Sequence, residues 1–182
     1  IARANLTAPT AVTTVDAQSI ELSGEDNIAE ILRGVPSFGA SGISSGNSNF
    51  FTNSAGINTL QLRNLGENRT LVLVNGRRYV AGVPGTTIVD FNSIPTDLLE
   101  RVEVVTGGAS AVYGADALAG VINVILRDDF EGIEYRYQYG ESDYGDDVNH
   151  RLSALMGGNF ADGRGNAVIN AAFTQNGGVY AR

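Results

Sequence analysis

Residues 42–46 read Gly-Ile-Ser-Ser-Gly and match G-x-S-x-G, the spacing that presents a nucleophilic serine in hydrolases. Such a serine needs a strand before it, a helix after it, and a histidine and an acid within reach. Here the motif lies inside a Gly/Ser-rich tract, and the only histidine, His150, belongs to another predicted region. Chance in a biased tract explains the match, so we expect no catalytic residues and no enzyme.

A second glycine-rich stretch, around Gly107, Gly108 and Gly114, has the small residues of a phosphate-binding loop. A Walker loop needs a lysine after its last glycine, but all 12 basic residues of this chain are arginine. The dinucleotide-binding pattern G-x-G-x-x-G is also missing from the strand-to-helix junction. We therefore expect no nucleotide and no other cofactor.

Acidic side chains gather at Asp128-Asp129 and in a turn that holds Asp143, Asp146 and Asp147. The carboxylates of the turn would suit Ca²⁺, but they lack the spacing of an EF-hand, and solvated acidic turns between strands are common. We expect no metal site. A net charge of −8 without a basic cluster is unfavourable for nucleic-acid binding. The absence of cysteine excludes disulfides and thiolate metal sites.

The elements that position these residues centre on residues 99–126. The β-branched run Arg101–Thr106 and the apolar run Gly120–Leu126 each predict a strand. Between them lie mostly glycine, alanine and serine, whose small side chains let backbones approach closely. This composition predicts a segment that is tightly buried.

Residues before this segment predict shorter elements. A strand is expected near 11–15, and a helix with Ser23 as its N-cap is expected to end at Gly34 and Pro36. Strands are expected at 59–63 and 70–74, the second of which leads into the hairpin signal Asn75-Gly76. A helix of one or two turns is expected from Ser93 to near Glu100.

Two long loops interrupt these elements, at 39–58 and 81–92. Loops of this length are often functional, and Phe50 and Phe51 lie among hydrogen-bonding side chains of the first. Two interpretations stay open for these aromatic residues: contact with a ligand, or anchoring of the loop to its own domain.

The composition changes after residue 129. Ile133, Tyr135, Tyr137 and Tyr139 alternate with polar residues, and further strands are expected at 152–160 and 166–173. Aromatic residues on one face and polar groups on the other suit the wall of an outer-membrane barrel. An ordinary antiparallel meander with one solvated face is the alternative.

Two signatures in this sequence resemble a known family. LERVEVVTGGASAVYGADALAGVINVIL, at residues 99–126, resembles the plug-domain signature of TonB-dependent outer-membrane receptors, usually ERIEV-x-x-G-x-x-S-x-x-Y-G-x-x-A-x-x-G-V-I-N. Residues 62–77 resemble a second pattern, L-R-G…R-x-L-V-L-x-D/N-G, with Asn64 in place of the usual glycine. The matched motif positions are Asn75, Gly76, Gly107, Gly108, Ser110, Tyr113, Gly114, Gly120 and Asn123.

The resemblance implies an α+β plug domain over residues 1–127, built around a small mixed four-stranded sheet. Residues 128–182 would then be about the first three antiparallel strands of a transmembrane β-barrel, which has about 22 strands in the full family. Barrel strands alone need more residues than this chain has, so we expect a piece of a longer protein.

The resemblance also implies TonB-dependent, energy-coupled uptake of a scarce solute across the outer membrane of a Gram-negative bacterium. The solute would be a siderophore or other metal chelate, cobalamin, a glycan or a similar nutrient. TonB would act through an N-terminal box expected before Ile1, and outer-membrane lipid would surround the barrel. Apical loops would contact the solute, and we assign this role to Asn49, Phe50, Phe51, Asn53 and Pro84.

In the resembled family, arginines of the plug pair with acids of the barrel wall. By position this role falls to Arg63 and Arg101, with Glu100 beside the second. The rival interpretation is a soluble periplasmic or secreted ligand-binding module rich in β-structure, in which residues 130–182 complete a β-sandwich. The tyrosine face separates the two, because only a lipid-facing wall needs detergent once isolated.

Overall fold

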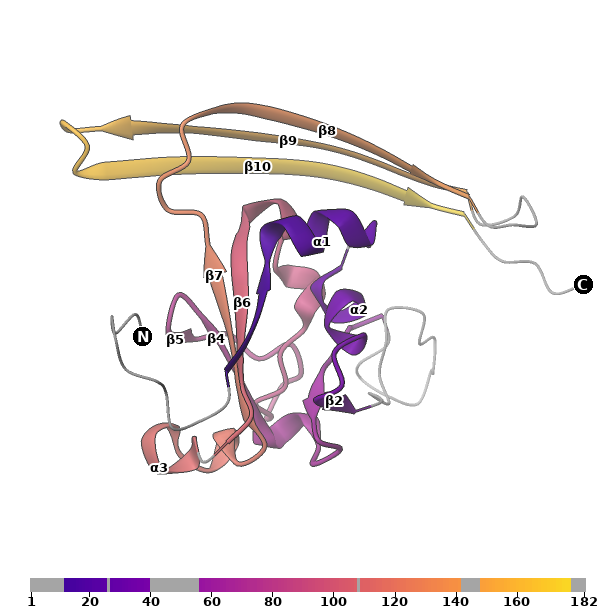
Figure 1. Cartoon of the computed structure of the whole chain (residues 1–182), viewed down its shortest axis with the longest axis vertical. Helices are drawn as coiled ribbons and strands as arrows, with labels where there is room; N and C mark the ends of the chain where they lie inside the picture. The colour runs from indigo at the N-terminus through magenta and orange to yellow at the C-terminus, as the bar shows by residue number, and fades with distance from the viewer. Residues whose placement is uncertain (1–11, 26, 40–55, 108, 142–147, 178–182) are drawn as a thin grey trace, which may run out of the picture. The chain divides into compact units, whose positions relative to one another are not determined.

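The computed structural model describes residues 12–25, 27–39, 56–107, 109–141 and 148–177 (Figure 1). The chain divides into two compact units, residues 1–126 and 127–182, and each is described by itself. In the described ranges, no helix has the length and apolar character needed to cross a membrane.

The first unit is built on a five-stranded mixed sheet in the order β1-β6-β7-β4-β5. All neighbouring strands are antiparallel except β4 and β7, which run parallel. We expected four strands; the fifth forms because the turn at Asn75-Gly76 returns the chain for two residues. The strands are β1 (Val12–Asp16), β4 (Thr70–Val74), β5 (Arg77–Arg78), β6 (Leu99–Val105) and β7 (Gly120–Leu126).

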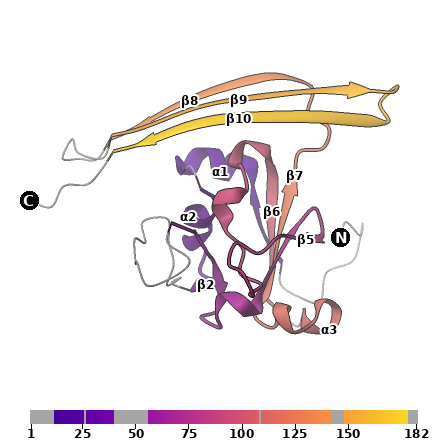
Figure 2. The same cartoon turned by 180° about the vertical axis from the view of Figure 1, so that it is seen from behind.

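The larger hydrophobic core lies between one face of this sheet and two helices, α1 (Ala17–Ser23) and α2 (Ile28–Arg33). Both helices lie on the same side of the sheet (Figures 1 and 2). Ile28 and Leu32, one turn apart on α2, are fully buried, and each such side chain stabilises the fold by roughly 1.5–3 kcal/mol. From the sheet, alternate strand positions supply Val72, Val102, Val104, Ile122 and Val124.

The opposite face of the sheet carries a smaller core. Leu71, Leu73 and Val121 pack there with Ala109 and Ala117 from the segment between β6 and β7. That segment holds α3 (Ser110–Tyr113) and the 3-10 turn η4 (Ala115–Ala117). The small residues there are buried as expected at 109, 117 and 119, whereas Val112 and Leu118 are exposed.

The helix expected to begin after Ser23 begins instead after Asn27, as α2, so the predicted N-cap was wrong. Ser23 ends α1, and the following Gly24 has a positive φ of 74° that interrupts the helical path. The N-cap of α2 is Asn27, whose backbone is extended and whose Oδ1 accepts a 2.8 Å hydrogen bond from the amide of Ala29.

Short elements complete the first unit. Only two residues of the strand expected at 59–63 pair, as β3 (Gln61–Leu62) with β2 (Phe38–Gly39). The helix expected from Ser93 is replaced by 3-10 turns, because β6 already begins at Leu99. The turns of this region are η2 (Phe91–Ser93) and η3 (Thr96–Leu98). A further 3-10 turn, η1 (Glu67–Arg69), precedes β4.

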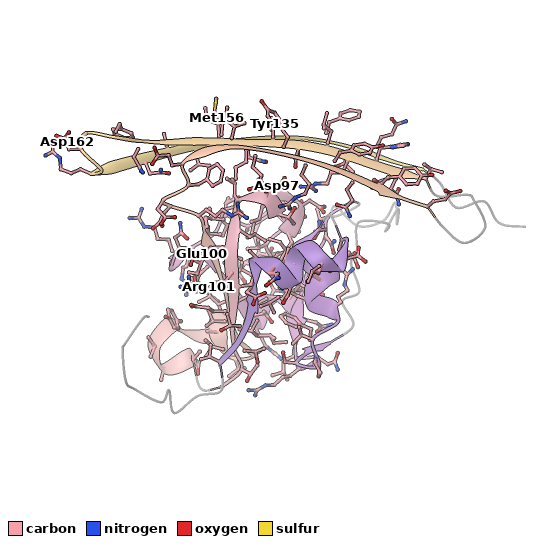
Figure 3. All side chains as sticks on the ribbon, turned by 45° about the horizontal axis from the view of Figure 1, so that its top comes forward. Asp97, Glu100, Arg101, Tyr135, Met156 and Asp162 are labelled. Carbon is pink, nitrogen blue, oxygen red and sulfur yellow. The ribbon has the colours of Figure 1, made fainter. Side chains whose placement is uncertain are left out.

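The second unit is a three-stranded antiparallel sheet in the order β10-β9-β8. Its strands are β8 (Gly132–Gly140), β9 (Asn149–Phe160) and β10 (Gly165–Asn176). The register places Tyr135 opposite Ala154, which in turn lies opposite Ala171. One face therefore gathers exposed apolar side chains, and Tyr135 and Met156 project from it on the same side (Figure 3). The others are Ile133, Tyr137, Tyr139, Leu152, Phe160, Ile169 and Phe173.

Candidate functional site

The structure brings together motif residues from three distant parts of the chain at one end of the first sheet. Asn75 and Gly76 form the turn between β4 and β5, both with positive φ, as a tight hairpin requires. The amide of Gly76 donates a 3.0 Å hydrogen bond to Oδ1 of Asn123 on β7, and Oδ1 of Asn75 accepts a 2.9 Å bond from the amide of Leu126. The turn is thus bonded to β7 by two side-chain amides.

Asn123 extends this network to β6. Nδ2 of Asn123 donates to Oε2 of Glu103 at 3.2 Å, and Nε of Arg101 donates to Oε1 of Glu103 at 3.0 Å. Arg101 also pairs with Glu100, its neighbour on β6 (Figure 3). Arg101 is therefore ion-paired within the first unit, whereas the pairing of Arg101 with a barrel acid remains a prediction.

These contacts shift the pKa values of Glu103 and Arg101. Burial raises the pKa of Glu103, but the hydrogen bonds from Arg101 and Asn123 and the charge of Arg101 outweigh burial and leave that pKa below its ordinary value of 4.5. The hydrogen bond to Glu103 raises the pKa of Arg101, and burial opposes the rise without cancelling it. Both groups are therefore charged at neutral pH.

Two motif glycines occupy positions that side chains would disturb. Gly120 has a φ of +142°, and a Cβ added there would lie 2.3 Å from the carbonyl oxygen of Val105 and 2.8 Å from Cδ1 of Leu62. Gly114 ends α3 with a φ of +91°, and its amide donates a 2.9 Å bond to the carbonyl oxygen of Ser110. Glycine at 120 thus permits a close approach of β6 and β7, and at 114 it permits a turn.

The remaining motif residues surround α3. Gly107 lies two residues after the end of β6, and Ser110 and Tyr113 are half-buried in α3, while Gly108 lies outside the described residues. Arg78 on β5 joins this segment to the sheet: it pairs with Asp116 at 2.6 Å and donates a 2.6 Å bond to the carbonyl oxygen of Tyr113.

Arg63, the other arginine assigned to a barrel contact, is exposed in a turn after β3. Arg63 and Asn64 both adopt left-handed backbone angles, φ 54° and 56°. Asparagine tolerates that geometry better than most residues, which explains how position 64 departs from glycine without loss of the turn. Among the described residues, no ion pair to Arg63 is formed.

Of the residues assigned to solute contact, only Pro84 is among the described residues. Asn49, Phe50, Phe51 and Asn53 lie outside the described residues, as do residues 42–46 of the G-x-S-x-G match. Pro84 is exposed in the second loop, next to Gly85 with a φ of 75°. These assignments therefore stay predictions.

His150, the histidine weighed against a hydrolase triad, lies on β9 beside two tyrosines. Its Nδ1 is 2.9 Å from the hydroxyl of Tyr137, and its ring centroid is 5.2 Å from that of Tyr139. In the part of the chain that the structure describes, no three acidic or histidine side chains cluster closely enough to hold a metal.

Sequence reasoning missed a polar cluster between α2 and the two long loops. Asn58 is fully buried there, and it meets Asp90 and Arg33, which lie far from it in the sequence. The only local signal is Asp-Phe-Asn at 90–92, where the Asp90 carboxylate accepts a bond from the amide of Asn92 in an Asx turn.

Comparisons with known proteins agree on one family. A profile described as TonB-dependent Receptor Plug Domain matches residues 4–121. The vitamin B12 transporter BtuB of Vibrio vulnificus (strain CMCP6) is 37% identical over 113 residues, which are 62% of this chain and 17% of that protein. The matched part of the chain thus spans about a sixth of this curated relative.

Solved receptors share the fold. A mutant of the ferric enterobactin receptor PfeA from Pseudomonas aeruginosa, in complex with enterobactin, matches 94% of this chain and 25% of its own, with a TM-score of 0.69 at 21% identity. The siderophore receptor PirA from Acinetobacter baumannii matches 91% of this chain and 24% of its own, with a TM-score of 0.67 at 21% identity. At such identities the likeness establishes the fold alone.

Proposed function

Because this chain belongs to the family of TonB-dependent receptor plug domains, we propose that it supplies the pore-closing plug and the first wall strands of an outer-membrane importer. The plug would comprise residues 1–127 and the wall strands residues 128–182, within a barrel of about 22 strands. The imported solute would be scarce outside the cell and too large for passive pores.

The observation that carries the proposal is that two units with different surfaces follow one another along the chain. The first has the plug fold with a buried core, and the second is an antiparallel sheet whose exposed face is lined by tyrosine, isoleucine, leucine and phenylalanine. Contiguous apolar surface of this kind is rare on soluble proteins, and alternation of apolar and polar residues along each strand is typical of barrel walls in lipid.

The polar face of the same sheet supports the proposal that this sheet is a barrel wall, whose inner side would face a lumen filled by a plug. Glu134 on β8 accepts bonds from Arg127 at 3.1 Å and from Arg136 at 2.8 Å. Charged groups on the interior side of a barrel wall are ordinary, whereas the same groups would be costly toward lipid.

The family and its relatives support a proposal for the energy coupling and for the class of solute. We propose that TonB, driven by the proton gradient of the inner membrane, acts on a segment N-terminal to the plug, and that the plug then rearranges to open a path. The relatives named for vitamin B12 and for ferric enterobactin make these two compounds the first probes to try.

Uptake in a deletion strain tests the proposal. The gene that contains this chain is deleted and restored, and accumulation of labelled vitamin B12 and ferric enterobactin is measured with and without a protonophore, and in a second strain that lacks TonB. We expect restoration of uptake for one probe, and loss of that uptake under protonophore or without TonB. Uptake that persists under both treatments would contradict energy coupling.

A further inference from the structure

We propose that Asn58, Asp90 and Asn92 form a clamp that fixes the bases of both long loops to α2, and that these residues are positioning residues for solute binding. The proposal rests on the proposed function in that the two loops are taken to contact the solute. The clamp itself consists of described residues only.

Asn58 is at the centre of the clamp, where its side chain joins the loop base to α2. Its Oδ1 accepts a 2.6 Å hydrogen bond from Nη2 of Arg33, and its Nδ2 donates a 3.3 Å bond to Oε1 of Glu30. Arg33 and Glu30 also form an ion pair with each other. Asn58 is fully buried, and a buried amide that lost these partners would be costly.

The backbone of Asn58 joins the second loop. Its amide donates a 3.0 Å bond to Oδ1 of Asp90, and its carbonyl oxygen accepts a 2.9 Å bond from the amide of Phe91. Residues 56–58 are the last residues of the first loop, and Asp90 lies near the end of the second. The two loop bases are thus held side by side by one main-chain hydrogen bond and by one bond from a main-chain amide to the Asp90 carboxylate.

Asn92 forms a second connection between the loops and α2. Its Nδ2 donates a 2.8 Å bond to the carbonyl oxygen of Gly56, and its Oδ1 accepts a 2.6 Å bond from Nδ2 of Asn27. Asn27 is the N-cap of α2. This six-residue helix therefore holds the loop bases at its N-cap through Asn27, in its first turn through Glu30 and at its last residue through Arg33.

This arrangement makes the position of one loop depend on the other. Asp90 Oδ1 accepts bonds from the amides of Asn58 and Asn92 together, so removal of this acceptor breaks both bonds at once and weakens the attachment of both segments. A ligand that contacts both loops would bind more weakly to loops that are no longer held in one arrangement, because binding would then have to order them.

Amide hydrogen exchange in the full-length native protein tests the clamp through a reporter in the second loop. The amide of Gly82 bonds to the carbonyl oxygen of Ile88 within that loop. Gly82 packs against Asp90, where an added Cβ would lie 2.7 Å from the Cβ of Asp90, and both Asp90→Ala and Asp90→Asn keep that Cβ. We expect Asp90→Ala to speed exchange about tenfold at both Asn58 and Gly82, and Asp90→Asn, which keeps the acceptor oxygen, to stay within about twofold of the native protein.

The experiment has two controls, a variant and an amide that both lie outside the clamp. Thr87→Ala removes an exposed hydroxyl of the second loop that bonds to the carbonyl oxygen of Asn68, outside the clamp, and should leave exchange at Gly82 unchanged. The amide of Ala119, bonded to the carbonyl oxygen of Arg69, should be unaffected by every variant. If Asp90→Ala yields no heat-modifiable barrel, Asn58→Ala provides the same readout.

Binding of vitamin B12 and ferric enterobactin supplies the functional readout. For the probe that the native protein binds, we expect Asp90→Ala to raise the dissociation constant about tenfold and Asp90→Asn to restore it. Faster exchange at Asn58 with native exchange at Gly82 would overturn the clamp, and an unchanged dissociation constant would overturn its positioning role. If neither probe binds the native protein, the proposed solutes are wrong while the exchange experiment still decides the clamp.

Discussion

Side-chain amides connect segments of the first unit that are far apart in the sequence. An asparagine carries an acceptor and donors on one short side chain, so it can serve a backbone amide and a carboxylate together. Asn123 does this between Gly76 and Glu103, and neither aspartate nor leucine could make both bonds. The family-motif asparagine at 123 is therefore explained by its two partners.

Glu103 should make the stability of the first unit depend on pH. Its pKa is lowered in the folded state, so its contribution to stability is complete above about 4.5 and is lost as pH falls through the lower folded-state pKa. We expect Glu103→Gln to remove part of this acid sensitivity. Unfolding of the sheet, followed by hydrogen exchange at β6 and β7 between pH 6 and pH 3, measures it; identical pH profiles for the two proteins would contradict the assignment.

Gly120→Ala should destabilise the first unit by about 1–3 kcal/mol, because alanine disfavours a positive φ and its Cβ would meet the carbonyl oxygen of Val105. Gly34→Ala is the matched control, since Gly34 ends α2 with helical angles and its added Cβ has ordinary contacts. Exchange of the β7 amides under native conditions compares them. Equal stability of the two variants would show that the close approach at Gly120 is not required.

At the scale of elements, successive side chains of each strand point to opposite faces of its sheet. In the first unit both faces of β4 and β7 are buried, one against α1 and α2 and the other against the segment from Ala109 to Ala117. In the second unit one face is apolar and exposed while the other is mostly polar. These patterns suit a strand inside a domain and a strand in a barrel wall, respectively.

Local patterns predicted the strands well and the helices poorly. The apolar runs of β4 and β7 have the bounds expected from sequence, and the hairpin formed where Asn75-Gly76 indicated. Helix α1 was missed because Ala17–Ser23 has no strong start signal beyond Asp16, whose Oδ1 accepts a bond from the amide of Ser19. The clamp at Asn58 could not be predicted, since its partners come together only in the tertiary fold.

A charge on the apolar face of β10 should prevent assembly into lipid. Ile169 lies near the middle of the strand and is exposed, and arginine at such a place costs about 2–4 kcal/mol in a bilayer. The neighbouring Asn170 points to the other face at the same depth, so Asn170→Arg should be tolerated. The fraction of heat-modifiable protein in outer membranes measures both. Equal yields for Ile169→Arg and Asn170→Arg would favour a soluble sandwich.

At the scale of the whole molecule, this chain corresponds to only part of the length of its relatives. It spans 17% of the BtuB relative and 25% of the PfeA chain, so solute uptake, TonB coupling and barrel closure are properties proposed for the protein that contains it. The plug fold and the exposed apolar face of the second sheet are the two features of this chain that support the proposal.

The mass and cell fraction of the native gene product test this account most directly. The account predicts an outer-membrane protein several times larger than the 19.1 kDa of this chain, whose migration in a denaturing gel changes on heating because its barrel resists detergent. A soluble product of 19.1 kDa, with no heat-dependent migration, would contradict an outer-membrane importer and leave a plug-like module that acts without TonB.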